Sequence, residues 1–251
     1  MTVGLAAGRG VVVVVPTYNE HDNLEPLTAA ILAAVPEATV LIVDDRSPDG
    51  TGVLADTLAA RDPRIHVLHR TAKEGLGVAY RAGFRWALDR PTTRAVVQMD
   101  ADFSHDPADL PRLLAPLMTD ADLVIGTRYM RGGGTVGWPL RRQLVSRAGT
   151  LFARTVLLLP YRDLTGGFKA WRREALDAIR MREANANGYA FQIETTWWAY
   201  RRGTRVSQVP IIFRERVAGT SKMTGSIVRE ALVVVVRLRA GAIVDALRRR
   251  H

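Results

Sequence analysis

The chain contains no cysteine, only three lysines and no long uninterrupted hydrophobic run among its 251 residues. The absence of cysteine excludes disulfides, thiolate zinc sites, iron–sulfur clusters and thiol nucleophiles, so any metal must bind oxygen or imidazole ligands. The apolar run Ala231–Val236 is bordered by charged residues and is far shorter than the roughly 20 residues needed to cross a bilayer. Residues 1–10 lack the pattern of a signal peptide. We therefore predict no transmembrane span.

Two phosphate-binding patterns are also missing. No Gly-x-Gly-x-x-Gly follows the first apolar run and no P-loop lysine is present, which disfavours a dinucleotide dehydrogenase or a P-loop enzyme. With 47% hydrophobic and 24% charged residues, the composition is typical of a folded protein and excludes collagen, coiled coil and disorder. The length fits one large domain or two small ones, and we predict a single domain over residues 1–251.

The net positive charge of the chain comes entirely from its second half. Residues 1–127 hold 11 basic and 17 acidic side chains, whereas residues 128–182 hold 12 and 3, and residues 201–251 again hold 12 and 3. Nearly all of the basic residues are arginines, whose planar guanidinium groups suit two-pronged binding of phosphate. The asymmetry predicts a polyanionic partner, which is nucleic acid, an anionic bilayer or a phosphorylated substrate. A solvated basic surface is the alternative.

Short β-branched runs alternate with longer amphipathic stretches in the first half, which is the pattern of a mostly parallel sheet covered by helices. The predicted strands are Val11–Val15, Val40–Val43, Ile65–Leu68, Ala95–Met99 and Leu123–Ile125. The predicted helices are Asp22–Val35, Gly52–Ala60, Leu76–Leu88 and Pro107–Met118. Ligands of such α/β sheets bind beyond the carboxyl ends of the strands, so the polar residues that follow these strands are candidates for a site.

The second half has a different pattern. The run Arg131–Pro139 is too rich in glycine to be rigid without a ligand. Apolar residues then recur at helical spacing from Leu144 to Leu159, and again in Ser226–Arg250, where a valine-rich stripe is flanked by arginines. Each stretch predicts an amphipathic helix, which either lies in a membrane interface or packs on the core with solvated arginines.

Two carboxylates, Asp100 and Asp102, follow the predicted strand Ala95–Met99. Because side chains in a strand alternate with a period of two, both carboxylates lie on one side of the backbone. Two hard oxygen ligands suit Mg²⁺ or Mn²⁺ that also holds substrate phosphates. An acidic surface loop is the alternative, and the position directly after a buried strand favours the metal site.

Two other predicted strands also end in polar turns, Pro16–Glu20 and Asp44–Thr51. Carboxylates at successive strand ends can bind ribose hydroxyls and base N–H groups. For Asp44, Asp45, Asp49 and Asn19 the alternative is that each caps the helix that follows. These turns therefore predict a nucleotide site, with capping as the competing interpretation.

The motifs that carry a family resemblance extend from the first strand to Lys222 and so cover nearly the whole chain. They are Pro16–Glu20, Val43–Thr51, Gly75–Gly77, Met99–His105, Gly126–Tyr129, Asp163–Lys169 and Phe213–Lys222. Together they resemble the family 2 glycosyltransferases with the GT-A fold, and most of all the polyprenyl-phosphate (dolichol-phosphate) mannose synthases. The first two motifs are shared across family 2, and the last two point to this subgroup.

The resemblance implies an inverting glycosyltransferase that moves mannose from GDP-mannose to a polyprenyl monophosphate. It assigns nucleotide binding to Pro16, Tyr18, Glu20, Asp44 and Asp45. It assigns Mg²⁺ or Mn²⁺ to Asp100 and Asp102, with Asp102 as a catalytic residue. Some relatives have a glutamine as third ligand where this chain has Ser104, which leaves water or the diphosphate to complete the shell.

For the acceptor, the resemblance implies that basic and polar residues gather around the lipid phosphate, namely Arg128, Arg142, Ser146 and Arg214. It places Lys222 near the diphosphate and makes Arg128 and Lys222 catalytic. Arg142 and Ser146 are spaced i, i+4, which puts them on one face of a helix. Only three acidic residues occur in 128–182, so we expect few carboxylate partners for these arginines, although pairing with surface carboxylates is the alternative.

The same resemblance divides the chain into a nucleotide and metal half, 1–127, and a basic acceptor and membrane-interface half, 128–251. It places the protein at the cytoplasmic face of a membrane, in peripheral contact with the membrane surface. A membrane-anchoring protein is a further partner, and nucleic acid is not one. The nearest rival is the same fold with another sugar nucleotide such as UDP-glucose, and the second is a non-catalytic basic protein that binds membrane or nucleic acid.

Four other side chains have competing interpretations. Glu194 or Asp163 could serve as a catalytic base, but a lipid phosphate is already anionic and needs none, so a structural role is favoured for Glu194. His105 could reach the metal, but capping or solvent exposure is favoured. Trp138, in the glycine-rich run, is either an interfacial or lid residue or an ordinary packed side chain.

Overall fold

The computed structural model of the chain describes residues 3–179, 186–188, 190–215 and 225–248. Its central layer is a seven-stranded sheet with the order β3-β2-β1-β4-β7-β5-β8. Strand β7 runs antiparallel to both of its neighbours, and the other pairs are parallel. The strands of this sheet are β1 (Val11–Thr17), β2 (Thr39–Asp44), β3 (Ile65–His69), β4 (Ala95–Gln98), β5 (Leu123–Thr127), β7 (Lys169–Arg172) and β8 (Val206–Pro210).

A smaller parallel sheet joins β6 (Gly134–Val136) to β9 (Ile212–Arg214). The helices are α1 (Val3–Ala6), α2 (His21–Ala34), α3 (Thr51–Arg61), α4 (Leu76–Leu88), α5 (Leu110–Leu114), α6 (Leu140–Leu157), α7 (Arg173–Ala178), α8 (Ala190–Arg201) and α9 (Gly225–Arg248). Two 3₁₀ turns, η1 (Pro107–Asp109) and η2 (Ala115–Met118), flank α5. Strand β6 lies within the glycine-rich run, where strand pairing with β9 orders the backbone.

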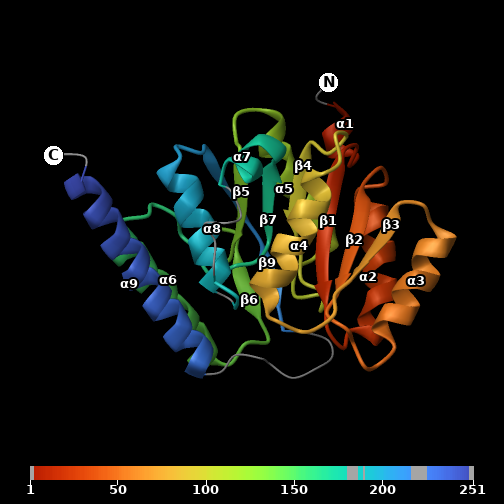
Figure 1. Cartoon of the computed structure of the whole chain (residues 1–251), viewed down its shortest axis with the longest axis horizontal. Coiled ribbons are helices and arrows are strands. Elements are labelled where there is room, and N and C mark those ends of the chain that lie inside the picture. Colours follow the sequence, from red (N-terminus) through yellow and green to blue (C-terminus); the bar gives the residue numbers. More distant parts are fainter. Residues whose placement is uncertain (1–2, 180–185, 189, 216–224, 249–251) are drawn as a thin grey trace.

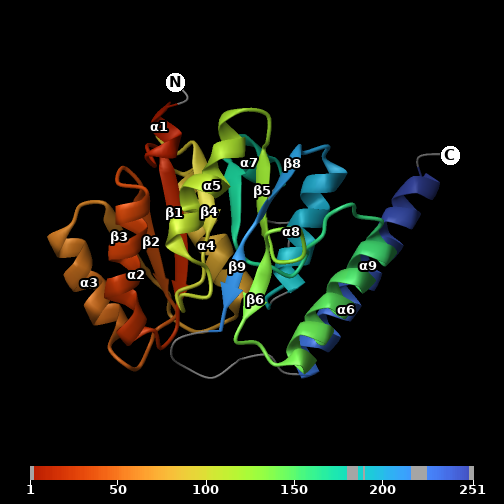
Figure 2. The ribbon, with the colours of Figure 1, turned by 180° about the vertical axis from the view of Figure 1, so that it is seen from behind.

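Alternation along β1 divides its valines between two cores. Val12 and Val14 pack in a cluster with Tyr80 of α4 and Phe191 of α8. Val13 belongs to the other cluster, which contains the apolar faces of α2, α3 and α5. Figure 1 shows α4 and α8 in front of the sheet, and Figure 2 shows α2 and α5 covering the opposite face. Since helices cover both faces, the ends of the strands remain for ligands.

The predicted mostly parallel sheet flanked by helices is confirmed, and all five predicted strands are present. The predicted helix 107–118 is instead three short turns, because Pro111 and Pro116 lack the N–H groups that a continuous helix needs. Strand β8 of the second half pairs with β5 of the first half, so both halves contribute strands to one sheet.

The two predicted amphipathic helices are α6 and α9, which lie side by side at the end of the molecule beyond β8 (Figure 1, Figure 2). Leu157 of α6 and Val235 of α9 are buried, while Leu144 and Val233 are exposed. Among the described residues, we find no helix with both the length and the apolar character that a membrane span requires.

Candidate functional site

The turns that follow β1, β2 and β4 share an unusual backbone feature. Each contains a non-glycine residue with positive φ: Asn19 at 59°, Arg46 at 57° and Phe103 at 58°. This left-handed conformation costs an L-residue roughly 1–2 kcal/mol. Because β1 lies between β2 and β4 in the sheet, these three turns are neighbours. Strained backbone of this kind collects at functional sites, where the surrounding structure holds it in place.

Asp44 and Asp45, both predicted to bind the nucleotide, are buried at the end of β2. Asp44 Oδ1 accepts hydrogen bonds from the hydroxyls of Thr17 (3.0 Å) and Ser47 (2.6 Å). Asp45 Oδ1 accepts from Arg70 at 2.6 Å. Burial raises the pKa of Asp45, and the nearby Arg70 only partly offsets that rise. The Asp44 carboxylate therefore ties β1 to the turn after β2, whether or not it also contacts a ligand.

The Pro16–Glu20 turn is joined to the Asp44–Thr51 turn. Glu20 N–H donates to Thr51 Oγ1 (3.0 Å), and Asp49 accepts from the backbone N–H groups of both Thr51 and His21. Asp49 thus binds the first N–H of α3 and of α2, although the N-cap residue of α3 is Gly50. The half-buried ring of Tyr18 lies 3.6 Å below Lys73 Nζ, and Pro16 is half-buried within β1. Two adjacent strand ends therefore bring together the five residues predicted to bind the nucleotide, which are Pro16, Tyr18, Glu20, Asp44 and Asp45.

The two predicted metal ligands lie just beyond β4. Tyr80 donates its hydroxyl to Asp100 Oδ1 (3.2 Å), and Ser104 N–H donates to Asp102 Oδ1 (3.1 Å). No set of three or more acidic or histidine side chains able to hold a metal occurs in the described part of the chain. Ser104 Oγ is buried and has no hydrogen-bond partner among these residues. Two carboxylates beside an unpaired hydroxyl fit a Mg²⁺ or Mn²⁺ ion whose remaining ligands come from a diphosphate.

The expectation that His105 caps a helix or faces solvent is wrong. Its side chain is fully buried, stacks on Phe168 with ring centroids 4.9 Å apart, and accepts the Asp100 N–H at Nδ1 (3.2 Å). Burial lowers the pKa of His105, which favours the neutral ring that this hydrogen bond requires. His105 therefore supports the backbone of the Asp100–Asp102 turn.

Arg128 does not have the free guanidinium that its sequence neighbourhood predicts. It makes a two-pronged ion pair with Asp163 at 2.7 and 2.8 Å and also donates to Thr165 Oγ1 at 2.8 Å. Both charged side chains are almost completely buried. Burial opposes both charges, but their mutual attraction prevails: the pKa of Arg128 is raised and that of Asp163 is lowered. Asp163 is therefore the partner of Arg128 and is unsuited to act as a base.

Arg142 also has an acidic partner, so the expectation of few carboxylate partners is wrong for both arginines. Its Nη1 donates to the two oxygens of Glu215 at 2.6 and 2.7 Å. Its Nε is buried and has no hydrogen-bond partner within the described ranges. Ser146, one turn along α6, accepts from Tyr129 Oη at 2.7 Å. The Nε–H of Arg142 is thus a donor that no described residue uses.

An aromatic cluster connects the arginines to the metal loop. The Phe213 ring contacts His105 and Trp138, with centroids 5.3 and 5.1 Å apart, and the Arg142 guanidinium lies 4.1 Å from the Trp138 ring. Arg214 is exposed, and its N–H donates to Ser104 O at 3.1 Å. Trp138 is only 7% exposed, which contradicts an interfacial position and supports ordinary packing. Lys222 lies outside the described residues.

Two buried groups beside this region were missed or left open by sequence reasoning. Glu194 is buried and accepts the Ala186 N–H at 2.7 Å, which confirms its structural role. Lys169 is completely buried and donates to Gln192 O (2.6 Å) and Thr196 Oγ1 (2.9 Å). Burial lowers the pKa of Lys169 to about 7, although Asp163 pulls it the other way. No sequence pattern distinguishes Lys169 from an exposed lysine.

The buried Lys169 predicts a specific pH dependence of stability. Unfolded, the lysine keeps its proton up to a pH of about 10.4, whereas in the folded protein it loses the proton above about pH 7. The unfolded state therefore binds more protons in this window, and stability rises with pH by at most roughly 1.4 kcal/mol per unit. We expect Lys169→Met to remove this contribution in urea unfolding between pH 7 and 9.5, and Lys73→Met, at an exposed position, to leave it unchanged. Equal slopes in wild type and Lys169→Met would contradict the prediction.

Comparison with known proteins adds to this geometry. Residues 12–180 match the family described as glycosyl transferase family 2. A protein from Micrococcus luteus named undecaprenyl-phosphate mannosyltransferase is 52% identical over 241 residues, which cover 96% of this chain and 98% of that protein. A protein from Mycolicibacterium smegmatis named polyprenol monophosphomannose synthase is 48% identical over 224 residues, which cover 89% of this chain and 84% of that protein.

Solved structures show the same fold. The crystal structure of glucosyl-3-phosphoglycerate synthase from Mycobacterium tuberculosis in complex with Mn²⁺, UDP-glucose and phosphoglyceric acid matches with a TM-score of 0.70. The match covers 95% of this chain and 82% of the other, at 22% sequence identity. At that level of identity the likeness extends to the arrangement of helices and strands and no further.

Proposed function

This chain belongs to glycosyl transferase family 2, and on that premise we propose that it transfers mannose from GDP-mannose to a polyprenyl monophosphate, with inversion at the anomeric carbon. The names of two relatives at about 50% identity support the sugar and the acceptor class. The observation that carries the proposal is that the predicted metal ligands and the predicted acceptor residues meet at the loop after β4. Asp100 and Asp102 lie in this loop, and Arg142 and Arg214 adjoin it through the Phe213 cluster.

The donor would lie across the ends of β1, β2 and β4. Pro16, Tyr18, Glu20, Asp44 and Asp45 line the turns where the nucleoside would bind. Asp100 and Asp102 would hold the divalent ion, which would neutralise charge on the departing nucleoside diphosphate. The buried, unpaired Ser104 hydroxyl supports this role, because a polar atom left without a partner there is costly unless a ligand satisfies it.

The acceptor phosphate would bind between α6 and β9. Arg142 Nε is a donor without a partner in the described part of the chain, and Ser146 lies on the same helix face. A phosphate oxygen would attack C1 of mannose in line with the bond to the diphosphate, and GDP would leave as that bond breaks. The acceptor phosphate is already anionic and needs no carboxylate base. The two candidates for that role, Glu194 and Asp163, already accept hydrogen bonds from Ala186 and Arg128. Arg128, already paired with Asp163, would border the phosphate site, and Lys222 would act on the diphosphate.

Transfer itself tests the proposal. Purified protein would be incubated with radiolabelled GDP-mannose or UDP-glucose, a divalent metal and a defined polyprenyl phosphate, and the lipid fraction would be counted. We expect label in the lipid with GDP-mannose and metal only. If label entered the lipid from UDP-glucose and not from GDP-mannose, the donor would be UDP-glucose, as the rival hypothesis states. No binding of either sugar nucleotide in calorimetry would leave the non-catalytic basic protein as the remaining hypothesis.

Arg142 provides a test of the acceptor site. Lysine keeps the positive charge but loses the guanidinium donors, so Arg142→Lys should weaken use of the polyprenyl phosphate by roughly 1–3 kcal/mol. GDP-mannose affinity should be unchanged, because the arginine lies on the acceptor side of the loop. Acceptor KM and nucleotide Kd would be measured on the same preparations, with the exposed neighbour Arg141→Lys as control. A weaker nucleotide Kd with an intact acceptor KM would assign Arg142 to the donor.

The exposed faces of α6 and α9 support a peripheral position on the membrane. Ten of the fourteen exposed large apolar side chains of the described residues lie on these two helices. A polyprenyl acceptor resides in a bilayer, and arginines beside apolar side chains suit an anionic interface. We expect Leu144→Asp with Leu151→Asp to reduce sedimentation with anionic vesicles several-fold, while Val53→Asp on α3 does not. Unchanged sedimentation would favour an anchoring protein as the partner of these faces.

A further inference from the structure

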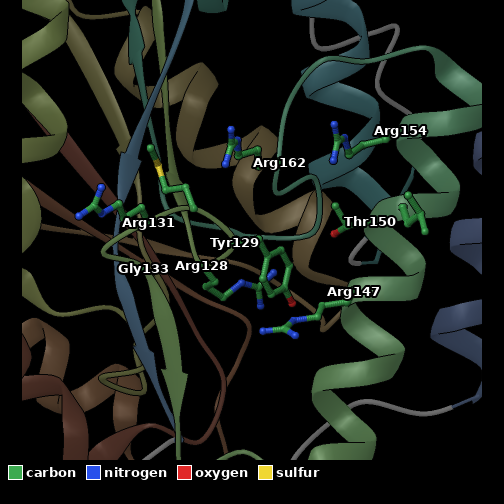
Figure 3. A pocket seen from close by; sticks show the side chains of 10 residues that line it. Arg128, Tyr129, Arg131, Gly133, Arg147, Thr150, Arg154 and Arg162 are labelled. Carbon is green, nitrogen blue, oxygen red and sulfur yellow. The ribbon is translucent and has the colours of Figure 1, made fainter.

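A basic cavity lies between α6 and the connection that follows β5. Its volume is about 510 Å³. It is lined by Arg128, Tyr129, Met130, Arg131, Gly133, Arg147, Thr150, Leu151, Arg154 and Arg162. Figure 3 shows Arg147, Thr150 and Arg154 projecting from α6 toward Tyr129 and Arg162. The proposed transfer reaction uses only Arg128 of this lining.

The cavity contains hydrogen-bond donors that the protein does not satisfy. Thr150 is 3% exposed, and its Oγ1 has no hydrogen-bond partner in the described ranges. Arg154 lies one turn further along α6, and its Nε is likewise buried and unpaired there. Buried polar atoms without partners destabilise the folded protein. Two such atoms one helical turn apart, lining one cavity, indicate a ligand that accepts hydrogen bonds.

The charge of the lining specifies the ligand further. Arg131, Arg147, Arg154 and Arg162 have no ion-pair partner among the described residues, and no carboxylate lines the cavity. Two guanidinium groups lie near the Tyr129 ring, with Cζ of Arg128 5.1 Å and Cζ of Arg147 5.7 Å from its centroid. Unpaired like charges gathered in one cavity repel each other, and an anion with several acceptor oxygens would relieve that repulsion.

We propose that this cavity binds a phosphate group, with Thr150 Oγ1 and Arg154 as its principal donors. The cavity adjoins the proposed acceptor site, because Arg128 borders both, but its donor Arg154 is a separate contact: twelve residues of helix separate it from Arg142, a rise of roughly 18 Å. The chemistry is that of a phosphate ester, carried either by an acidic phospholipid headgroup or by a soluble organic phosphate. The proposal concerns binding alone and does not depend on mannosyl transfer.

Calorimetric titration of the full chain with glycerol phosphate tests the site, and Arg142→Gln removes the proposed acceptor contact. In that background we expect binding to persist, to weaken about tenfold or more with Arg154→Gln, and to stay within twofold with Arg141→Gln. Arg141 is an exposed residue of the same helix that does not line the cavity, so the two variants lose the same charge. Equal weakening by both variants would overturn the proposal.

Co-sedimentation with phosphatidylcholine vesicles, with and without phosphatidic acid, identifies the source of the phosphate. If co-sedimentation requires both phosphatidic acid in the vesicles and Arg154 in the protein, the ligand is a lipid headgroup. If glycerol phosphate binds in calorimetry but co-sedimentation does not depend on phosphatidic acid and Arg154, the ligand is a soluble phosphate. Failure of both ligands to bind the wild-type chain would overturn the proposal.

Thr150→Val is a second, independent test. Valine has the same branched shape, so the substitution removes an unpaired buried hydroxyl and should leave the thermal midpoint equal or higher. Affinity for whichever phosphate binds should nevertheless fall several-fold. A folded Thr150→Val protein with unchanged phosphate affinity would show that Thr150 serves packing only and would contradict the assigned donor.

Discussion

Asp102→Asn is expected to lose at least about a hundredfold in metal-dependent transfer, because a neutral amide is a poor ligand for a hard divalent ion and that ion would supply several kcal/mol of charge stabilisation. The fold should tolerate the change. Asparagine Oδ1 can still accept the Ser104 N–H that Asp102 accepts at 3.1 Å. Removal of one of two neighbouring carboxylates also relieves repulsion, so the thermal midpoint without nucleotide should be unchanged or higher.

A matched control for this variant lies in the same loop. Asp106→Asn makes the same charge change at a residue that accepts the Ala108 N–H at the start of η1, a role that asparagine also fills. We expect Asp106→Asn to keep both transfer activity and metal dependence. Substantial metal-dependent turnover in Asp102→Asn would place the metal at other residues. Loss of activity in both variants would indicate a general effect of charge on the loop.

Asp163→Ala is expected to cause the largest loss of stability, about 3–5 kcal/mol in the free energy of unfolding. The Arg128 guanidinium is almost completely buried, and Asp163 accepts three of its hydrogen bonds, including one from the backbone N–H. Without Asp163 the positive charge of Arg128 would remain in a desolvated position with no counter-charge. Urea unfolding of wild type and variant at neutral pH measures the difference.

Two comparisons separate this effect from a general effect of losing an ion pair. Glu37→Ala breaks the exposed Arg9–Glu37 pair, in which the side chains are 70% and 42% exposed, and should cost at most about 1 kcal/mol. Arg128→Met combined with Asp163→Leu removes both buried charges, and we expect it to be more stable than Asp163→Ala alone. If the double variant were the less stable one, the isolated charge of Arg128 would not be the source of the cost.

Local sequence patterns determined much of the first half of the fold. The five consecutive valines of Val11–Val15 predicted a strand of a helix-covered sheet, and the helix Leu76–Leu88 has the bounds that its periodicity and flanking turns indicated. The strand-end turns were predicted in the same way, because polar residues directly after apolar runs must lie at the edge of a sheet. In each case the information lies within about ten consecutive residues, which is the range over which backbone periodicity acts.

The partners of the charged residues were decided by tertiary structure. Arg128 pairs with Asp163, 35 residues away, and Arg142 with Glu215, 73 residues away, although local composition predicted few such partners. The burial of His105 and Lys169 and the cavity at Thr150 and Arg154 likewise depend on which segments pack together. The residue type determines which hydrogen bonds a side chain can form and which charge it can carry. Which of them are satisfied, and which remain for a ligand, depends on contacts between segments that are distant in the chain, and no local pattern contains that information.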